Sequence, residues 1–99
     1  MENTYITITH INDYAGYEVF RPGMELTLKK DTNNAYDDEA IAVYGPHGGK
    51  YGYVGNSVHS VCRGTHSAGY VYESVGEDTP CRVCFVAEDF VIALLGAAS

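Results

Sequence analysis

The chain has 99 residues, of which 13 are acidic, six are lysine or arginine and four are histidine, so its formal net charge is −7. This length suits one domain with one hydrophobic core, and a hydrophobic fraction of 45% with 19% charged residues excludes intrinsic disorder. The acidic balance excludes a protein that coats nucleic acid or an anionic membrane through bulk charge, so any anion-binding role needs a local basic cluster.

Alternation of apolar and polar residues predicts four strands in the first half of the chain: residues 4–10, 24–29, 40–44 and 51–54. Residues 11–23 are rich in turn-forming residues and predict loops with a short strand around Val19. Residues 31–38 are polar and loop-like, and the Pro-His-Gly-Gly run at 46–49 predicts the turn of a hairpin.

The second half of the chain changes character. Asn56 or Ser57 can cap a short helix with apolar residues at Val58, Val61 and Cys62, and Gly64 can end it. Three further strands are expected at residues 70–75, 81–88 and 90–95. We therefore expect a mainly β protein, a small antiparallel barrel with one or two short helices, one of which plugs an end.

The sequence also bears on the cellular compartment of the protein. No stretch approaches the roughly 18 apolar residues that cross a bilayer, and residues 1–10 lack the basic flank and apolar run of a signal peptide. Three cysteines are an odd number, which is more typical of a reducing compartment than of a disulfide framework. We expect a cytoplasmic protein that does not contact membranes.

The pair Cys81 and Cys84 has the spacing of a metal or redox motif. It lies in an apolar, β-branched run, where positions three apart point to opposite faces of a strand, and only Cys62 and His66 could complete a zinc site. The preferred interpretation is two small buried thiols. No nucleophile pattern, phosphate cradle or acid–base pair is visible elsewhere, so we expect no catalytic residues, no metal and no cofactor.

Nine tyrosines are the more informative feature. Tyr51 and Tyr53 share one face of an expected strand, and Tyr70 and Tyr72 share a face of another. Aromatic side chains on a barrel surface can stack on unpaired bases. Tyrosine also has high strand propensity and fills the margins of small barrels, and composition alone favours this structural role.

The run DTNNAYDDEAIAV from Asp31 to Val43, followed by GGKYGYV at 48–54, resembles the signature of the HIRAN domain. That family carries a pattern close to D-x-x-N-P-[YH]-D-x-x-A-I-x-V, then a short hairpin and G-[YH]-[VIL]. Nine residues fall in register: Asn34, Tyr36, Asp37, Ala40, Ile41, Val43, Gly52, Tyr53 and Val54. Ala35 stands where the family usually has proline. The resemblance implies a single HIRAN-like domain over residues 1–99.

The resemblance further implies a modified OB-like barrel that binds nucleic acid. In eukaryotic helicase-like fork remodellers the domain holds the 3′ end of single-stranded DNA. By motif position, the family's binding tyrosine and aspartate fall on Tyr36 and Asp37, and its later aromatic or histidine falls on Tyr53. A lysine of the family's site falls near Asn56, and residues 12–17 in the first loop include no arginine for the family's arginine–aromatic pair.

The chemistry of these residues agrees with reading a strand end. A 3′-hydroxyl is a donor, so a fixed Asp37 carboxylate can accept from it, whereas the same carboxylate repels a 3′-phosphate. Tyr36 or Tyr53 can stack on the last base for about 1–3 kcal/mol. The alternative for Asn34 and Asp37 is local, because both side chains can hydrogen-bond their own loop as Asx turns; the two roles are compatible.

Half of the basic residues lie around this motif, namely Lys29, Lys30 and Lys50. If all three neutralise phosphates, the logarithm of affinity should fall with that of salt with a slope of about −2 for a single strand. We therefore expect a non-catalytic module that binds single-stranded DNA or DNA 3′ ends, in repair or replication-fork processing. The alternative is an adaptor without DNA binding, whose acidic surface meets a basic protein partner.

Overall fold

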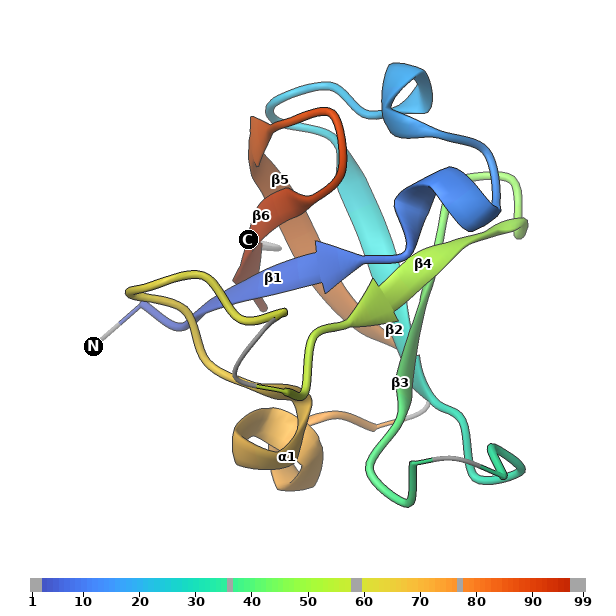
Figure 1. Ribbon diagram of the computed structural model, residues 1–99, viewed down its shortest axis with the longest axis vertical. Helices are drawn as coiled ribbons and strands as arrows, with labels where there is room; N and C mark the ends of the chain where they lie inside the picture. Colours follow the sequence, from blue (N-terminus) through green and yellow to red (C-terminus); the bar gives the residue numbers. More distant parts are fainter. Residues whose placement is uncertain (1–2, 36, 58–59, 77, 97–99) are drawn as a thin grey trace.

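The computed structural model describes residues 3–35, 37–57, 60–76 and 78–96. Its strands form a closed antiparallel barrel in the order β1-β4-β3-β2-β5-β6 (Figure 1). The strands are β1 (Tyr5–Thr9), β2 (Glu25–Lys30), β3 (Ile41–Tyr44), β4 (Lys50–Val54), β5 (Thr79–Val86) and β6 (Val91–Leu95). The expectation of a small antiparallel barrel is confirmed. β1 to β4 lie where alternation placed strands, and β5 and β6 overlap the strands expected at residues 81–88 and 90–95.

Alternating residues of the strands fill the barrel interior. Ile6 and Ile8 of β1 and Leu26 and Leu28 of β2 are almost fully buried, which is the face that alternation predicted. Thr7 lies on the other face of β1 but is also buried, because its hydroxyl bonds the Thr65 hydroxyl at 2.7 Å and accepts from the Cys62 amide at 3.1 Å. The segment after β4 therefore covers β1 from outside.

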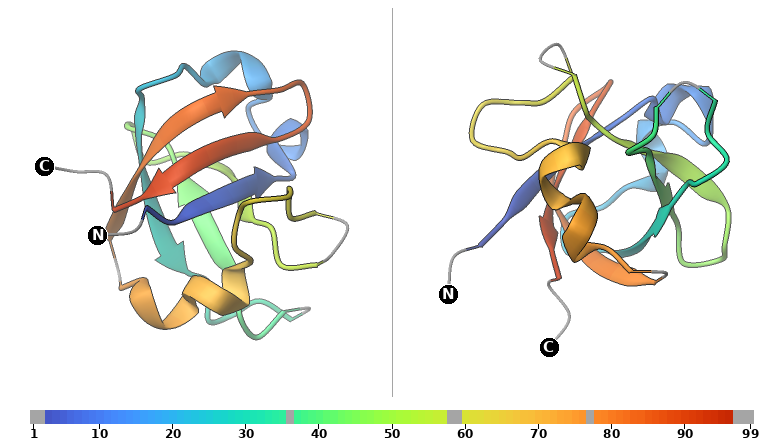
Figure 2. Two further views of the ribbon diagram at one scale, coloured as in Figure 1. Left: turned by 90° about the vertical axis from the view of Figure 1, so that its left-hand side faces the viewer. Right: turned by 90° about the horizontal axis from the view of Figure 1, so that it is seen from below.

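One end of the barrel is covered by the short helix α1 (Ala68–Val71), which runs on into a 3-10 helix η3 (Tyr72–Ser74) (Figure 2). Ala68, Val71 and Val75 join the core from this side. The expected helical plug is therefore present, but it lies later in the chain than predicted. Among the described residues no helix has the length and apolar character needed to cross a membrane.

The prediction of a helix between Asn56 and Gly64 is wrong for the residues the structure describes there; Val58 lies outside them. The segment forms turns instead. The Ser60 amide donates to the Ser57 carbonyl at 3.0 Å, and the Thr65 hydroxyl donates to the Cys62 carbonyl at 2.7 Å. These local side-chain and turn bonds compete with a helix.

The predicted strand at residues 70–75 is also wrong, because this stretch forms α1 and η3. The Ser67 hydroxyl accepts from the Tyr70 amide at 3.2 Å and so caps the helix. A closed barrel offers no free edge on which another strand could pair. Tyrosine and valine therefore sit in a helix here despite their strand propensity.

The loop between β1 and β2 contains two 3-10 helices, η1 (Ile11–Asp13) and η2 (Tyr17–Val19). The short strand expected around Val19 is absent from this described segment, because the Phe20 amide bonds the Tyr17 carbonyl at 3.1 Å within a turn. Phe20 is buried and packs edge-on against Tyr51 with ring centroids 5.3 Å apart. The loop is thereby fastened to β4 through the hydrophobic core.

Candidate functional site

A groove of about 580 Å³ lies where the ends of β1 and β4 meet the loop between β2 and β3. We call it the Asp37 groove. Four of the expected site residues line it: Asn34, Asp37, Tyr53 and Asn56. Its other lining residues are Thr9, His10, Asp13, Tyr14, Ala40, Val54, Ser57 and Ser60. The motif residues thus converge on one hollow of the surface.

Asp37 is held by hydrogen bonds from three directions. The Asn56 amide group donates to its Oδ1 and Oδ2 at 3.2 and 3.1 Å, and the Glu39 backbone amide donates to Oδ1 at 2.9 Å. The Asn34 Oδ1 accepts from the Asp37 backbone amide at 3.0 Å. The local turn-forming role expected of Asn34 and Asp37 is therefore confirmed. Oδ2 retains capacity for a further donor, since a carboxylate has about four acceptor sites.

Asn56 links this loop to the helix. While its amide nitrogen donates to Asp37, its Oδ1 accepts from the Gly69 backbone amide at 2.8 Å in α1. Where the family's site has a lysine, this chain therefore has an uncharged amide, and Asn56 uses both its donor and its acceptor in the described structure. A lysine could not make the second of these bonds.

Tyr53 sits in a chain of polar contacts with Lys50 and Asp31. Its hydroxyl accepts from the Lys50 ammonium and donates to the Asp31 carboxylate, each at 2.8 Å. The hydrogen bond from Tyr53 lowers the pKa of Asp31, and that with Tyr53 raises the pKa of Lys50. Asp31 was not among the expected site residues, although it begins the motif.

Tyr14 is a lining residue that sequence patterns did not identify. Its ring lies 6.3 Å from that of Tyr53 at 52°, and 43% of the residue is exposed. Desolvation is the main cause that raises the pKa of its hydroxyl. The Lys50 ammonium lies 5.9 Å from the Tyr14 ring centre and 4.9 Å from that of Tyr53. The only sequence signal was an aromatic residue in a polar loop.

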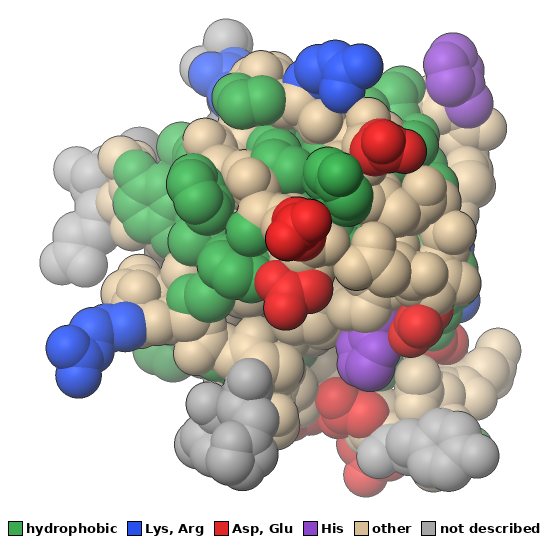
Figure 3. Space-filling model, turned by 45° about the horizontal axis from the view of Figure 1, so that its top comes forward, with side chains coloured by type: hydrophobic (Ala, Val, Ile, Leu, Met, Phe, Trp, Pro, Cys, Tyr) green, Lys and Arg blue, Asp and Glu red, His purple; other side chains and the backbone are tan. Residues whose placement is uncertain are grey.

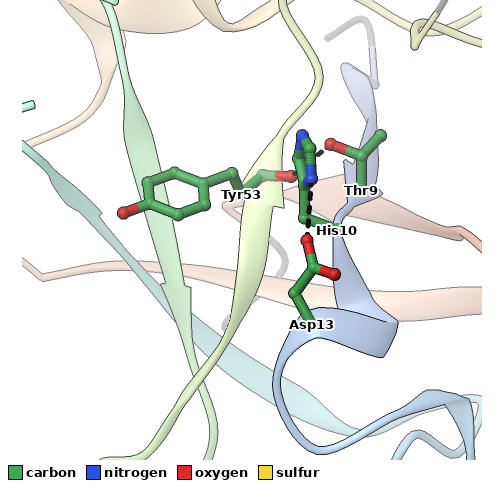
Figure 4. A network of polar contacts seen from close by, with 4 residues as sticks. All are labelled: Thr9, His10, Asp13 and Tyr53. Atoms are coloured by element: carbon green, nitrogen blue, oxygen red, sulfur yellow. Dashed lines mark hydrogen bonds and ion pairs between the residues drawn. The ribbon is translucent and has the colours of Figure 1, made fainter. Parts of the chain in front are cut away.

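The rim of the groove near η1 is polar. His10 Nδ1 and Asp13 Oδ2 are 3.1 Å apart, and the Thr9 hydroxyl donates to the Tyr53 carbonyl at 3.3 Å. Figure 4 shows the Tyr53 ring pointing away from the His10–Asp13 pair, with the Tyr53 backbone between them. The backbone of Tyr53 thus faces β1 while its ring extends toward Lys50 and Asp31.

Lys29 and Lys30 do not join this groove; they line a separate hollow with Thr32, Val75, Gly76 and Asp78. The Lys29 ammonium pairs with Asp78 at 3.2 Å, and that of Lys30 lies 4.3 Å from the centre of the Tyr72 ring. Of the three expected lysines, only Lys50 contacts side chains of the Asp37 groove. Tyr36, the first expected stacking residue, lies outside the described residues.

The cysteines occupy three different environments. Cys81 is fully buried, and desolvation raises the pKa of its thiol to about 12. Cys84 is exposed, so the expectation that both thiols are buried is wrong for this one. The two point to opposite faces of β5, and the pairing with β6 shifts register between Val83 and Phe85. Within the described ranges no three His, Cys, Asp or Glu side chains are grouped to hold a metal.

Comparisons with known proteins agree with this fold. The family model described as the HIRAN domain matches residues 1–78. The HIRAN domain of human HLTF superposes with a TM-score of 0.67 at 19% identity, covering 94% of this chain and 72% of that chain. A crystal structure of a protein from Lactobacillus plantarum gives 0.65 at 18% identity, covering 93% and 88%. No curated protein sequence matches the chain.

Proposed function

Because the chain belongs to the HIRAN domain family, whose domains bind nucleic acid without being catalytic themselves, we propose that it binds the free 3′-hydroxyl end of single-stranded DNA in the Asp37 groove. The observation that carries the proposal is the meeting of a carboxylate acceptor, Asp37, with two tyrosine rings, Tyr14 and Tyr53, in one groove. The carboxylate accepts from the terminal hydroxyl, and the rings stack on the last base.

The charge of the groove supports binding of a strand end rather than of several consecutive phosphates. Its described lining includes the carboxylates of Asp13 and Asp37 but neither lysine nor arginine. Lys50 contributes one cation beside the two tyrosine rings. Phosphates threaded along these carboxylates would be repelled, whereas a terminal nucleoside carries a hydroxyl there. Among the described residues Lys50 is the one lysine or arginine that contacts this groove, so its contribution to the salt slope is about −0.7.

The test uses single-stranded oligonucleotides that differ only in a 3′-hydroxyl or a 3′-phosphate, measured by fluorescence anisotropy at about 50 mM salt. The hydroxyl form should bind more tightly, and Asp37→Asn should remove most of this preference because the repulsive charge is lost. Asp38→Asn is the matched control, since Asp38 is exposed and does not line the groove. Equal binding of both forms by the unmodified protein contradicts end recognition.

A second candidate function has support from a different surface. Phe85 on β5 is 54% exposed and lies 6.3 Å from Phe90, next to the acidic residues Glu88 and Asp89. Figure 3 shows apolar side chains gathered on part of the face seen from above, with acidic side chains beside them. Such a patch suits a protein partner with apolar and basic side chains. Negligible binding of both oligonucleotides at low salt favours this adaptor role.

We further propose that the domain extends over residues 1–99, beyond the matched residues 1–78, because β5 and β6 are needed to close the barrel. In this proposal the module has no catalytic activity of its own and serves DNA repair or replication-fork processing. Removal of the residues after 78 should then leave an unfolded chain, which circular dichroism would detect. A truncated chain that stays folded contradicts the longer boundary.

A further inference from the structure

A second hollow of about 500 Å³ adjoins the Asp37 groove, and we call it the Tyr70 groove. Asn56 and Ser57 line both. Its remaining lining residues are Val61, Cys62, Arg63, Gly64, Thr65, His66, Ser67 and Tyr70. The two hollows differ in charge, because this described lining contains Arg63 and no carboxylate, whereas the Asp37 groove contains two carboxylates.

An aromatic pair forms one wall of the Tyr70 groove. The rings of His66 and Tyr70 are stacked, with centroids 4.1 Å apart and planes inclined by 14°. Tyr70 is nevertheless 68% exposed, the highest value among the large exposed hydrophobic residues of the described structure. His66 covers one face of the tyrosine ring, so the exposed area leaves the other face open to a planar ligand.

Backbone hydrogen bonds fix the positions of both members of this pair. The His66 backbone amide donates to the Tyr5 carbonyl at 2.7 Å, beside β1. Tyr70 is held by the cap from Ser67, and its neighbour Gly69 donates to Asn56 at 2.8 Å. Figure 1 shows the segment after β4 extending beside β1 before it returns to α1 at the end of the barrel. A platform that is already fixed loses little conformational freedom on binding.

We propose that the Tyr70 groove is a second subsite for single-stranded DNA, in which a base upstream of the 3′ end stacks on Tyr70 and Arg63 contacts the neighbouring phosphate; this inference rests on the proposed function of the Asp37 groove. The strand passes over Asn56 and Ser57, which line both hollows. The terminal nucleoside occupies the acidic hollow, and the phosphates begin where the lining becomes basic.

The chemistry of the residues matches this division. Every base has a π-face, so an open tyrosine ring binds without sequence preference. Arg63 is exposed and forms no ion pair with the residues described around it, so its guanidinium is available for a phosphate. The acidic surface of the chain makes one such cation important, because few other basic side chains can hold the strand.

The test compares the nucleoside thymidine and an octanucleotide of thymidine, both with 3′-hydroxyl groups, by NMR titration at low salt. The nucleoside has no upstream base and no phosphate, so it can occupy only the Asp37 groove. Tyr70→Ala should weaken the octanucleotide by about 5- to 160-fold, the value of one base stack, and leave binding of the nucleoside unchanged. Tyr70→Phe should retain binding, since the ring is kept. Arg63→Gln should weaken the octanucleotide and reduce its salt slope by about 0.7.

Matched controls are Tyr17→Ala and Arg21→Gln, which remove an exposed tyrosine and an arginine that line neither groove. If the unmodified protein binds both ligands and the variants at 63 and 70 bind them equally well, the second subsite is overturned while the first stands. A Tyr70→Ala variant that weakens binding of the nucleoside and of the octanucleotide equally also overturns it. Failure of the unmodified protein to bind either one overturns both proposals.

Discussion

The amide nitrogen of Asn56 donates to both carboxylate oxygens of Asp37, at 3.2 and 3.1 Å, although the residues are 19 positions apart in the chain. The same side chain accepts from Gly69 at the start of α1. One neutral amide therefore orients the carboxylate of the proposed hydroxyl acceptor and ties it to the helix that carries Tyr70. The amide nitrogen also donates to Glu39 Oε1 at 3.4 Å, so a carboxylate at position 56 would face two acidic side chains.

Asn56→Asp should destabilise the protein by about 1–3 kcal/mol near neutral pH, because two donors to a charged group are replaced by a repulsive carboxylate. Two neighbouring carboxylates, at positions 37 and 56, favour protonation of one of them in the folded variant. The difference in unfolding free energy between the variant and the unmodified protein should therefore shrink as pH falls toward about 4. Urea unfolding at both pH values measures it.

The control for this substitution is Asn3→Asp, which adds the same charge at an exposed position near the chain start. It should leave the unfolding free energy within about 0.5 kcal/mol of the unmodified protein. An Asn56→Asp protein as stable as this control at neutral pH would show that the bonds to Asp37 contribute nothing measurable.

Tyr53→Phe removes the hydroxyl that joins Lys50 to Asp31. The bond from Tyr53 lowers the folded pKa of Asp31, so its stabilisation is present above the unfolded pKa and is lost as pH falls through the folded value. We expect the unfolding free energy to fall by about 0.5–1.5 kcal/mol at neutral pH, a modest loss because Asp31 is partly solvated. The deficit should begin to shrink as pH falls below 3.8, the ordinary value, and the part that comes from Asp31 should be lost once pH lies below its lowered folded pKa.

Unfolding of both proteins across the acid range, monitored by circular dichroism, tests this linkage. Tyr44→Phe provides the matched control, because it removes a half-buried strand hydroxyl that no described residue bonds. The same deficit at every pH would instead assign the Tyr53 effect to packing.

The strands were predictable because their apolar residues alternate, as at Ile6 and Ile8, and burial of one face enforces that period. The position of the helix was not predictable in this way. Residues 70–75 have strand-forming side chains, and only the closure of the barrel, a long-range property, leaves them without a partner strand. The Ser67 cap was a local signal for the helix start that strand propensity outweighed.

Within the site, residues of the motif could be grouped from sequence because the loop and the returning strand are neighbours in the chain. Tyr14 could not, since it reaches Tyr53 only through the path of the first loop. For two of the lysines, proximity in sequence did not predict proximity in space. Lys29 and Lys30 are close to the motif in sequence, but their side chains meet Asp78 and Tyr72 on another part of the barrel.

Gly52 permits the close approach of β4 and β1. A Cβ atom added there would lie 2.6 Å from the Thr9 carbonyl oxygen, a backbone atom that cannot move alone. Gly52→Ala should destabilise the fold by about 1–3 kcal/mol, the usual cost of overpacking. Gly49→Ala is the matched control, because nothing lies within 4 Å of its added Cβ. Thermal unfolding should separate the two variants, and equal midpoints contradict the argument.

The two thiols of β5 should differ sharply in reactivity, because only a solvated thiolate attacks an alkylating reagent. Cys84 is exposed, whereas Cys81 is buried with its pKa raised to about 12. Iodoacetamide added to the folded protein at about pH 8 should therefore modify Cys84 within minutes and leave Cys81 unmodified, as read by peptide mass spectrometry. In urea both should react at similar rates, which serves as the control. Rapid modification of Cys81 in the folded protein would mean that the β5–β6 pair opens readily.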